Sequence, residues 1–272
     1  MHILAIGASR NIGYLATRTL LAENHTVTYL LRKPEVFDKD LELQKYIKNG
    51  QAKVIKGDAT VKEDIRKAFT ETSTNGNTLD AVLFSVGGSP SFTLTKGFVL
   101  NPPNLCSSSL FNVLACYPTN TPDAPQPKLI IISSNGLTDA GHAALPILIK
   151  PLFSSSALKS AHADKLVMER AVFHASNLTW PQKDPANIAT FLGASWKDEL
   201  KEPGYLKEVV IVRPSLLVNG NDSPPRGAYR TSTEELKGAY TISRKEVAHF
   251  VVEGVLKHWD QWRGKFVNIT GK

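Results

Sequence analysis

Two kinds of apolar pattern alternate along this chain of 272 residues. Short continuous apolar runs have the length of buried strands, and the stretches between them carry apolar residues at helical spacing. The expected strands cover residues 2–6, 26–32, 52–57, 79–86, 128–133, 208–214 and 266–270. The expected helices cover about residues 12–24, 38–48, 61–71, 104–117, 155–175 and 244–258. Apolar strands that alternate with helices predict a parallel sheet covered on both faces.

This order predicts the α/β class, with a doubly wound parallel sheet (a Rossmann fold) and a ligand crevice at the carboxyl ends of the strands. Residues 1–272 are expected to form a single domain. Residues 118–127 are expected to be a surface connection. Residues 176–207 and 219–238 follow the fifth and sixth strands, where a small C-terminal substrate-covering region would sit. An inert insertion explains these two segments equally well.

Composition narrows the classes of protein. The chain is 42% hydrophobic and 21% charged, and no apolar run has the length of a membrane span. The N-terminus lacks a signal-peptide pattern, and Cys106 and Cys116 fall about 15 Å apart on one expected helix, so a cytoplasmic protein with reduced thiols is expected. The net charge is +7, but Lys and Arg are scattered, which favours an anionic cofactor over nucleic acid. No membrane partner and no metal site are expected.

The segment IGASRNIG, residues 6–13, joins the first expected strand to the first expected helix. This is the setting that a dinucleotide-binding turn requires. Gly7 permits a tight turn, and Gly13 lets the helix pack closely on the sheet while its N–H groups face a pyrophosphate. Asn11 stands where a middle glycine is usual. Asn tolerates a positive φ better than other residues, so the turn is expected to survive this substitution.

This segment resembles the GASRGIG-type turn of short-chain dehydrogenases/reductases. The likeness continues through GDAT (57–60), SVGG (85–88), IISSNG (131–136) and VRPSLL (212–217). The stretch ISRKEVAHFVVEGVL resembles the atypical branch that is NmrA-like and flavin-reductase-like. The resemblance implies that Asp58 binds the adenine, that Val86, Gly87 and Gly88 flank its ribose, and that residues after the fifth and sixth strands line the nicotinamide.

The expected cofactor is NADP(H). Where an NAD enzyme ends its second strand with an acid, this chain has Arg32 and then Lys33. Arg10 matches the position that reaches the 2′-phosphate in NADP-dependent relatives, and guanidinium groups bind phosphate with charge-assisted hydrogen bonds. Solvated surface cations are the alternative reading. The full set of expected cofactor-binding residues is Gly7, Ser9, Arg10, Asn11, Ile12, Gly13, Arg32, Lys33, Asp58, Ala59, Val86, Gly87, Gly88, Ser133, Lys165, Pro214 and Leu216.

The catalytic pattern of the family is incomplete in this chain. Typical members have a proton-donating Tyr four residues before a Lys, which places both on one helix face. Here Ala161 replaces the Tyr, and Lys165 remains. Ser134, and less favourably Ser133, matches the family serine that orients a substrate oxygen. For either serine, the simple end of a strand is an equally good explanation.

Three further residues are weaker candidates. His162 has a suitable ordinary pKa, near 6.5, but lies about 100° around the helix from Ala161. Tyr240 could enter the site from the loop before the last helix, although packing explains most such tyrosines. Asn112 matches a helix asparagine that anchors a water relay in some relatives, but an ordinary polar helix residue is the favoured reading.

The missing donor limits the chemistry. Reduction of an isolated ketone creates a basic alkoxide that needs a positioned acid, whereas a quinone, flavin or conjugated carbonyl spreads the incoming charge. The sequence therefore favours an NADPH-dependent oxidoreductase acting on a small conjugated acceptor. The alternative is a non-catalytic NADP(H) sensor that acts on a protein partner, as the NmrA-like resemblance also implies. A sugar-nucleotide epimerase is disfavoured because that chemistry depends more heavily on the Tyr.

Overall fold

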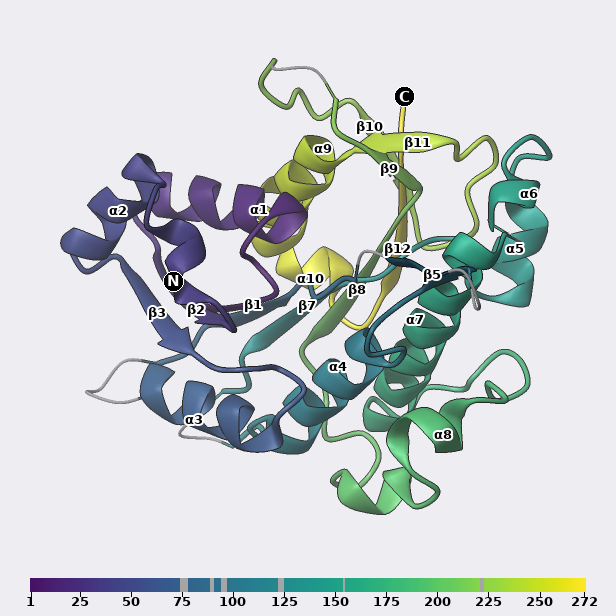
Figure 1. Cartoon of the computed structure of the whole chain (residues 1–272), viewed down its shortest axis with the longest axis horizontal. Helices are drawn as coiled ribbons and strands as arrows, with labels where there is room; N and C mark the ends of the chain where they lie inside the picture. The colour runs from purple at the N-terminus through teal and green to yellow at the C-terminus, as the bar shows by residue number, and fades with distance from the viewer. Residues whose placement is uncertain (74–77, 89–90, 94–96, 122–124, 154, 221–222) are drawn as a thin grey trace.

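The computed structural model describes residues 1–73, 78–88, 91–93, 97–121, 125–153, 155–220 and 223–272. A large twisted sheet runs through the protein in the strand order β10-β12-β8-β7-β4-β1-β2-β3 (Figure 1). Its strands are β1 (His2–Ile6), β2 (Thr26–Leu31), β3 (Ala52–Lys56), β4 (Ala81–Phe84), β7 (Lys128–Ile132), β8 (Val209–Pro214), β10 (Tyr229–Ser232) and β12 (Phe266–Gly271). Neighbouring strands pair in parallel, except that β10 runs antiparallel to β12.

Helices cover both faces of the sheet, as the apolar strands require. One face packs against α1 (Asn11–Ala22), α2 (Leu41–Lys48), α9 (Arg244–His249), the π-helical segment Phe250–Leu256 and α10 (Trp259–Trp262). The other face packs against α3 (Lys62–Thr72), α4 (Leu105–Cys116), α7 (Ser156–Ala175) and α8 (Ile188–Leu192). The remaining helices are α5 (Asp139–Ala144), α6 (Lys150–Phe153) and the 3₁₀ turns Pro34–Phe37 and Trp196–Glu199. The predicted doubly wound α/β fold is therefore confirmed.

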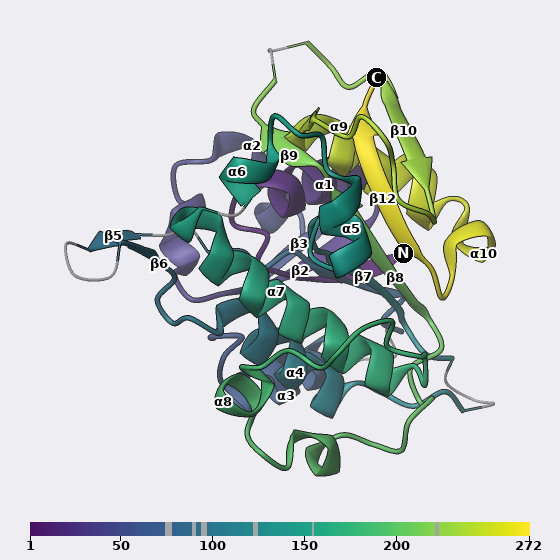
Figure 2. The same cartoon turned by 90° about the vertical axis from the view of Figure 1, so that its right-hand side faces the viewer.

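Several details differ from the sequence-based expectations. Residues 219–238 were expected to be a loop, but they include β10, which pairs with β12 and forms the edge strand of the large sheet. The expected helix 244–258 consists of α9 followed by the π-helical segment. Two small sheets also form: β9 (Leu216–Val218) with β11 (Thr241–Ser243), and β5 (Ser91–Thr93) with β6 (Gly97–Val99). Figure 2 shows β5 and β6 to one side of α7.

The two polar connections pack on the helices more than their composition indicates. In the segment 176–207, Trp196 and Leu206 are buried in the core that contains α4 and α7. In the connection 118–127, whose residues 122–124 lie outside the described part, Gln126 is only 5% exposed. Its side chain donates to the carbonyls of Pro118 and Tyr205 and accepts from two backbone N–H groups. The described residues of this connection are therefore not purely superficial.

Within the described ranges, no helix is long and apolar enough to span a membrane. The carboxyl ends of the parallel strands all lie at one edge of the sheet. This edge brings together the turn after β1, the loops after β2, β3 and β4, and the segments after β7 and β8. The expected site residues therefore share one edge, although some are separated by more than two hundred positions in the chain.

Candidate cofactor and substrate site

The turn after β1 has the backbone that its sequence predicts. Gly7 has a φ of +80°, and a methyl group added there would lie 2.5 Å from the backbone nitrogen of Val86. Asn11 has a φ of +57°, so the prediction that Asn fills a left-handed position is confirmed. A methyl group on Gly13 would lie 2.1 Å from the Ser85 hydroxyl. Both glycines thus allow the turn to lie against the end of β4, and the Ser85 hydroxyl donates to the Gly7 carbonyl over 3.1 Å.

The start of α1 fits a pyrophosphate. Arg10 is the N-cap residue with an extended backbone, and its side chain makes no capping hydrogen bond to the first turn. The N–H groups at a helix start need acceptors, and they favour anions because of the helix dipole. Ser9 is half-buried, Asn11 is exposed, and Ile12 is buried in the core. The turn therefore presents backbone donors at its surface while Ile12 anchors it below.

The cationic candidates lie on neighbouring loops at the same edge. Arg32 and Lys33 directly follow β2, which pairs with β1, and both are exposed. Arg10 is also exposed, on the turn that follows β1. Because β1 and β2 are adjacent and parallel, their carboxyl ends are side by side. This arrangement suits a phosphate that lies beside the crevice, although the role of the three cations stays a prediction.

The loop after β3 is held by its own hydrogen bonds. One carboxylate oxygen of Asp58 accepts from the backbone N–H and the hydroxyl of Thr60, over 2.9 and 2.8 Å. The side-chain amide of Asn112 donates to the Ala59 carbonyl over 3.0 Å. Asn112 thus connects α4 to the loop that is expected to face the adenine, which gives it a structural contact and does not support a water relay.

The segment after β4 lies against α4. The buried thiol of Cys106 donates to the Val86 carbonyl over 3.4 Å. Burial and the nearby Asp164 carboxylate raise the pKa of Cys106 to about 12, so this thiol stays protonated. Gly87 is exposed, and a methyl group there would meet no atom within 4 Å. Gly88 is half-buried beside Leu100.

Lys165 is the best-placed catalytic candidate. Its ammonium donates to the Ser133 carbonyl over 2.8 Å, so α7 brings it to the end of β7. Burial lowers the pKa of Lys165, and the Glu169 and Asp164 carboxylates oppose that shift. The Ser133 hydroxyl, however, donates to the buried Glu169 carboxylate over 2.6 Å. Ser134 is half-buried next to it.

The end of β8 meets the loop that carries Tyr240. The Pro214 carbonyl accepts from the backbone N–H of Asn135, which joins the segments after β7 and β8. The backbone N–H of Leu216 donates to the Tyr240 carbonyl over 3.2 Å. The Tyr240 side chain is 45% exposed. Tyr240 therefore lies beside a predicted nicotinamide-lining segment, and its catalytic role stays a prediction.

The surroundings of His162 argue against a proton-donor role. Its ring packs against Phe153, with ring centroids 5.0 Å apart. Burial, together with the charges of Lys165 and His142, lowers the pKa of His162 to about 4. The imidazole is consequently neutral near pH 7 and holds no readily released proton.

Two buried carboxylates at this site were not anticipated from the sequence. Both oxygens of Asp164, on α7, accept from the backbone N–H groups of Cys106 and Ser107 over 2.7 and 2.8 Å. Asp164 thus caps the start of α4 from another helix. Glu169 is fully buried and pairs with Arg213. The sequence signal for Glu169 was its partner Arg213, an arginine inside an otherwise apolar strand, because a buried charge requires a partner.

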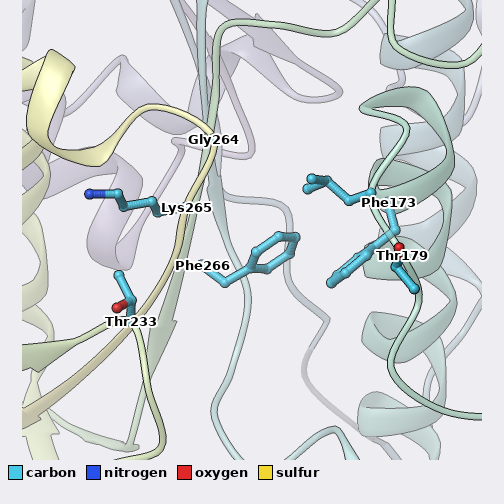
Figure 3. Close-up of a pocket in the computed structure, with 7 residues that line it drawn as sticks. Phe173, Thr179, Thr233, Gly264, Lys265 and Phe266 are labelled. Atoms are coloured by element: carbon cyan, nitrogen blue, oxygen red, sulfur yellow. The ribbon is translucent and has the colours of Figure 1, made fainter.

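An open hollow of about 310 Å³ lies elsewhere, beside the first residues of β12 (Figure 3). Phe173 and Phe266 are among the residues that line it, and their stacked rings have centroids 4.4 Å apart. Because Phe266 begins β12, the hollow is at the amino end of that strand and not at the carboxyl edge. It is therefore separate from the expected cofactor crevice.

The comparisons with known proteins agree with this geometry. A family model described as NAD(P)H-binding matches residues 7–258. The chain belongs to this NAD(P)H-binding family. The match confirms the predicted family relationship and an NAD(P)H cofactor, while the preference for the 2′-phosphate form stays a prediction. A comparison with curated protein sequences finds no match.

Solved structures show the same fold at low sequence identity. One is a putative NAD-dependent epimerase/dehydratase from Bacillus halodurans, with 17% identity, a TM-score of 0.58, and coverage of 100% of this chain and 94% of that one. Another is ChuY, titled an anaerobillin reductase, from Escherichia coli O157:H7, with 16% identity, a TM-score of 0.58, and coverage of 100% and 97%. A third is the oxidoreductase ylbE from Lactococcus lactis, with 13% identity, a TM-score of 0.59, and coverage of 100% and 91%.

Proposed function

We propose that this protein is an NADPH-dependent reductase of a conjugated carbonyl, quinone or flavin-like acceptor. The observation that carries the proposal is that Lys165 is retained while Ala161 replaces the proton-donating Tyr. Lys165 reaches the carboxyl edge, where its ammonium donates to the Ser133 carbonyl. The position that holds the family's Tyr carries only a methyl group.

The cofactor supplies a hydride, and the residues of this chain bind and orient the reactants. The N–H groups at the start of α1 bind the pyrophosphate, and Arg10, Arg32 and Lys33 bind the 2′-phosphate. Lys165 uses its remaining N–H donors to hold the nicotinamide ribose. Ser134 offers a hydroxyl to the acceptor oxygen.

The acceptor class follows from the lack of a proton donor. Since His162 is neutral near pH 7, it does not replace the Tyr. An acceptor that delocalises the incoming charge forms a weakly basic product, which can take its proton from water. A positioned acid contributes about two to four decades in rate for less stabilised products, so simple ketones are expected to react poorly. A reductase title on one structural neighbour agrees with this proposal without carrying it.

Steady-state NADPH oxidation against a panel of flavins, quinones, enones and unconjugated ketones tests the proposal. We expect turnover with at least one conjugated acceptor and loss of that turnover in Lys165→Ala. Lys159→Ala, which removes an exposed cation from the same helix, is the matched control and should keep full activity. Efficient, stereospecific reduction of an unconjugated ketone would contradict the acceptor class.

A non-catalytic sensor of the NADP redox state is the second candidate. The same missing donor favours it, because a sensor needs a binding site and no proton source. A sensor should bind oxidised and reduced cofactor with unequal affinity and consume neither. Tight NADP binding without turnover of any acceptor in the panel would therefore replace the reductase with the sensor.

A further inference from the structure

A continuous chain of contacts leads from Phe266, at the amino end of β12, to Lys165 at the carboxyl edge of the sheet. The Arg213 guanidinium lies over the Phe266 ring, 4.8 Å from its centroid. Two of its nitrogens donate to the two carboxylate oxygens of Glu169, over 3.0 and 2.5 Å. Glu169 accepts the Ser133 hydroxyl over 2.6 Å, and the Ser133 carbonyl accepts the Lys165 ammonium over 2.8 Å. Ser133 is thus held at two atoms, one by Glu169 and one by Lys165.

The burial of these groups makes a purely stabilising role a poor explanation. Glu169 is 0% exposed, Ser133 is 1% exposed and Arg213 is 9% exposed. A buried ion pair often stabilises a fold no more than well-packed apolar side chains do, because both charges lose their hydration. The benefit of this pair must therefore be sought in the geometry that it fixes.

We propose that Glu169 is a positioning residue for Lys165, acting through Ser133. Glu169 fixes the Ser133 hydroxyl, and this holds the Ser133 carbonyl where it binds one N–H of the Lys165 ammonium. The remaining N–H donors of Lys165 are then directed toward the crevice. Arg213 holds the Glu169 carboxylate in place through hydrogen bonds to both of its oxygens. The inference rests on the proposed function only in assigning Lys165 to the cofactor.

The charges around Lys165 agree with this arrangement. The groups that face its ammonium are the Cys106 thiol from α4 and the carboxylates of Asp164 and Glu169 from α7. His162, on α7, is neutral near pH 7. Burial lowers the pKa of Lys165, and the Glu169 carboxylate raises it again. Loss of the Glu169 charge should therefore shift the deprotonation of Lys165 to lower pH.

The test measures NADPH binding by fluorescence titration from about pH 7 to pH 11, the range that leads up to the ordinary pKa of Lys. Ser133→Ala removes the connecting hydroxyl and leaves the ion pair between Arg213 and Glu169 intact. We expect it to weaken NADPH binding about threefold to tenfold, as the loss of one hydrogen bond would. Glu169→Gln should weaken binding and move its alkaline limit to lower pH. Combined, the two substitutions should weaken binding by less than the product of their separate effects.

A matched carboxylate on the same helix provides the control. Asp164 also faces Lys165, but its oxygens bind the start of α4 and not Ser133. Asp164→Asn should therefore combine multiplicatively with Ser133→Ala, whereas Glu169→Gln should not. If the losses of NADPH affinity multiplied in both double variants, Ser133→Ala with Glu169→Gln and Ser133→Ala with Asp164→Asn, the positioning role of Glu169 would be overturned.

Glu169→Gln leaves Arg213 without its carboxylate, which is costly in a buried site. The paired substitution of Glu169→Leu with Arg213→Met removes both charges and fills the space, so it should fold with a Tm close to that of the wild type. We expect this variant to bind NADPH more weakly, about as Ser133→Ala does. Wild-type NADPH affinity and an unchanged pH profile, in Glu169→Gln and in the paired substitution alike, would overturn the proposal. Since the measurement is binding, a protein that binds NADPH but reduces no acceptor would contradict the reductase and leave this test intact.

Discussion

Two short stretches of this chain each depart from the family pattern by one residue, with different consequences. At the first, Asn11 replaces a glycine, and its backbone adopts a φ of +57°. At the second, Ala161 replaces a tyrosine, and His162 beside it is neutral near pH 7. A conformational role can be filled by another residue type that adopts the same backbone. A chemical role is lost when the reactive group is lost.

The largest expected loss of NADPH affinity comes from a substitution that disturbs the backbone of the first stretch. Gly7→Ala should lower NADPH affinity by more than about a hundredfold, because the added methyl group would lie 2.5 Å from the Val86 backbone and displace the turn. Gly50→Ala is the control, since Gly50 has a φ of +82° with no atom within 4 Å of an added methyl group. Equal losses of affinity in the two variants, measured by fluorescence titration, would mean that close packing at Gly7 is unimportant.

The next effect concerns the phosphate that the first stretch is proposed to bind. Arg32→Ala should weaken NADPH binding about tenfold to a hundredfold, as expected for lost charge-assisted hydrogen bonds, and leave NADH binding nearly unchanged. Lys48→Ala, at another exposed cation, should alter neither affinity. A parallel loss of NADPH and NADH affinity in Arg32→Ala would contradict a contact with the 2′-phosphate.

A third prediction tests whether the second stretch lacks an ionisable substitute. The pKa of His162 is about 4 in the folded protein and 6.5 ordinarily, so the unfolded chain binds more protons between these values. The free energy of unfolding should therefore fall as the pH drops from 6.5 to about 4, by at most about 3 kcal/mol.

Urea unfolding at several pH values measures this loss. His162→Leu should lose less stability over the same pH range than the wild type does, and His258→Leu, at an exposed histidine, should behave like the wild type. A His162→Leu variant with the pH dependence of the wild type would contradict the buried, neutral imidazole.

The smallest effects are expected at Asn11. Asn11→Gly should leave NADPH affinity within about twofold of the wild type. Asn11→Ala should lower the free energy of unfolding by about 1 kcal/mol, because Ala tolerates a left-handed backbone less well. Thermal unfolding and cofactor titration measure both. A large loss in Asn11→Gly would show that the Asn side chain, and not its backbone, carries the role, and the comparison between the two stretches would fail.

Much of the fold could be predicted because its signals are local. Continuous apolar runs identified the strands β1, β2, β3, β4, β7, β8 and β12, and glycine spacing identified the turn after β1. β10 was missed because Arg230 and its polar neighbours look like a loop, and only pairing with β12 makes them a strand. Such pairing joins distant segments, so periodicity within one segment does not reveal it.

The candidate site was predicted less completely than the fold. The positions of Lys165 and Asn11 followed from motifs with fixed spacing. The contacts of Ser133 did not, because its hydroxyl faces Glu169 in the interior while its carbonyl faces Lys165. A sequence motif gives the position of a residue along the chain, but it does not indicate which way each of its atoms points.

The cap that Asp164 provides for α4 bears on how the family's chemistry could be engineered into this protein. Asp164 lies within the stretch 161–165, and both its oxygens bind the first N–H groups of α4. Transplanting the whole catalytic segment of a relative would replace Asp164 and leave the start of a second helix without its acceptor. A single Ala161→Tyr substitution leaves Asp164 in place, so it is a better starting point for a tyrosine-dependent enzyme than a grafted motif.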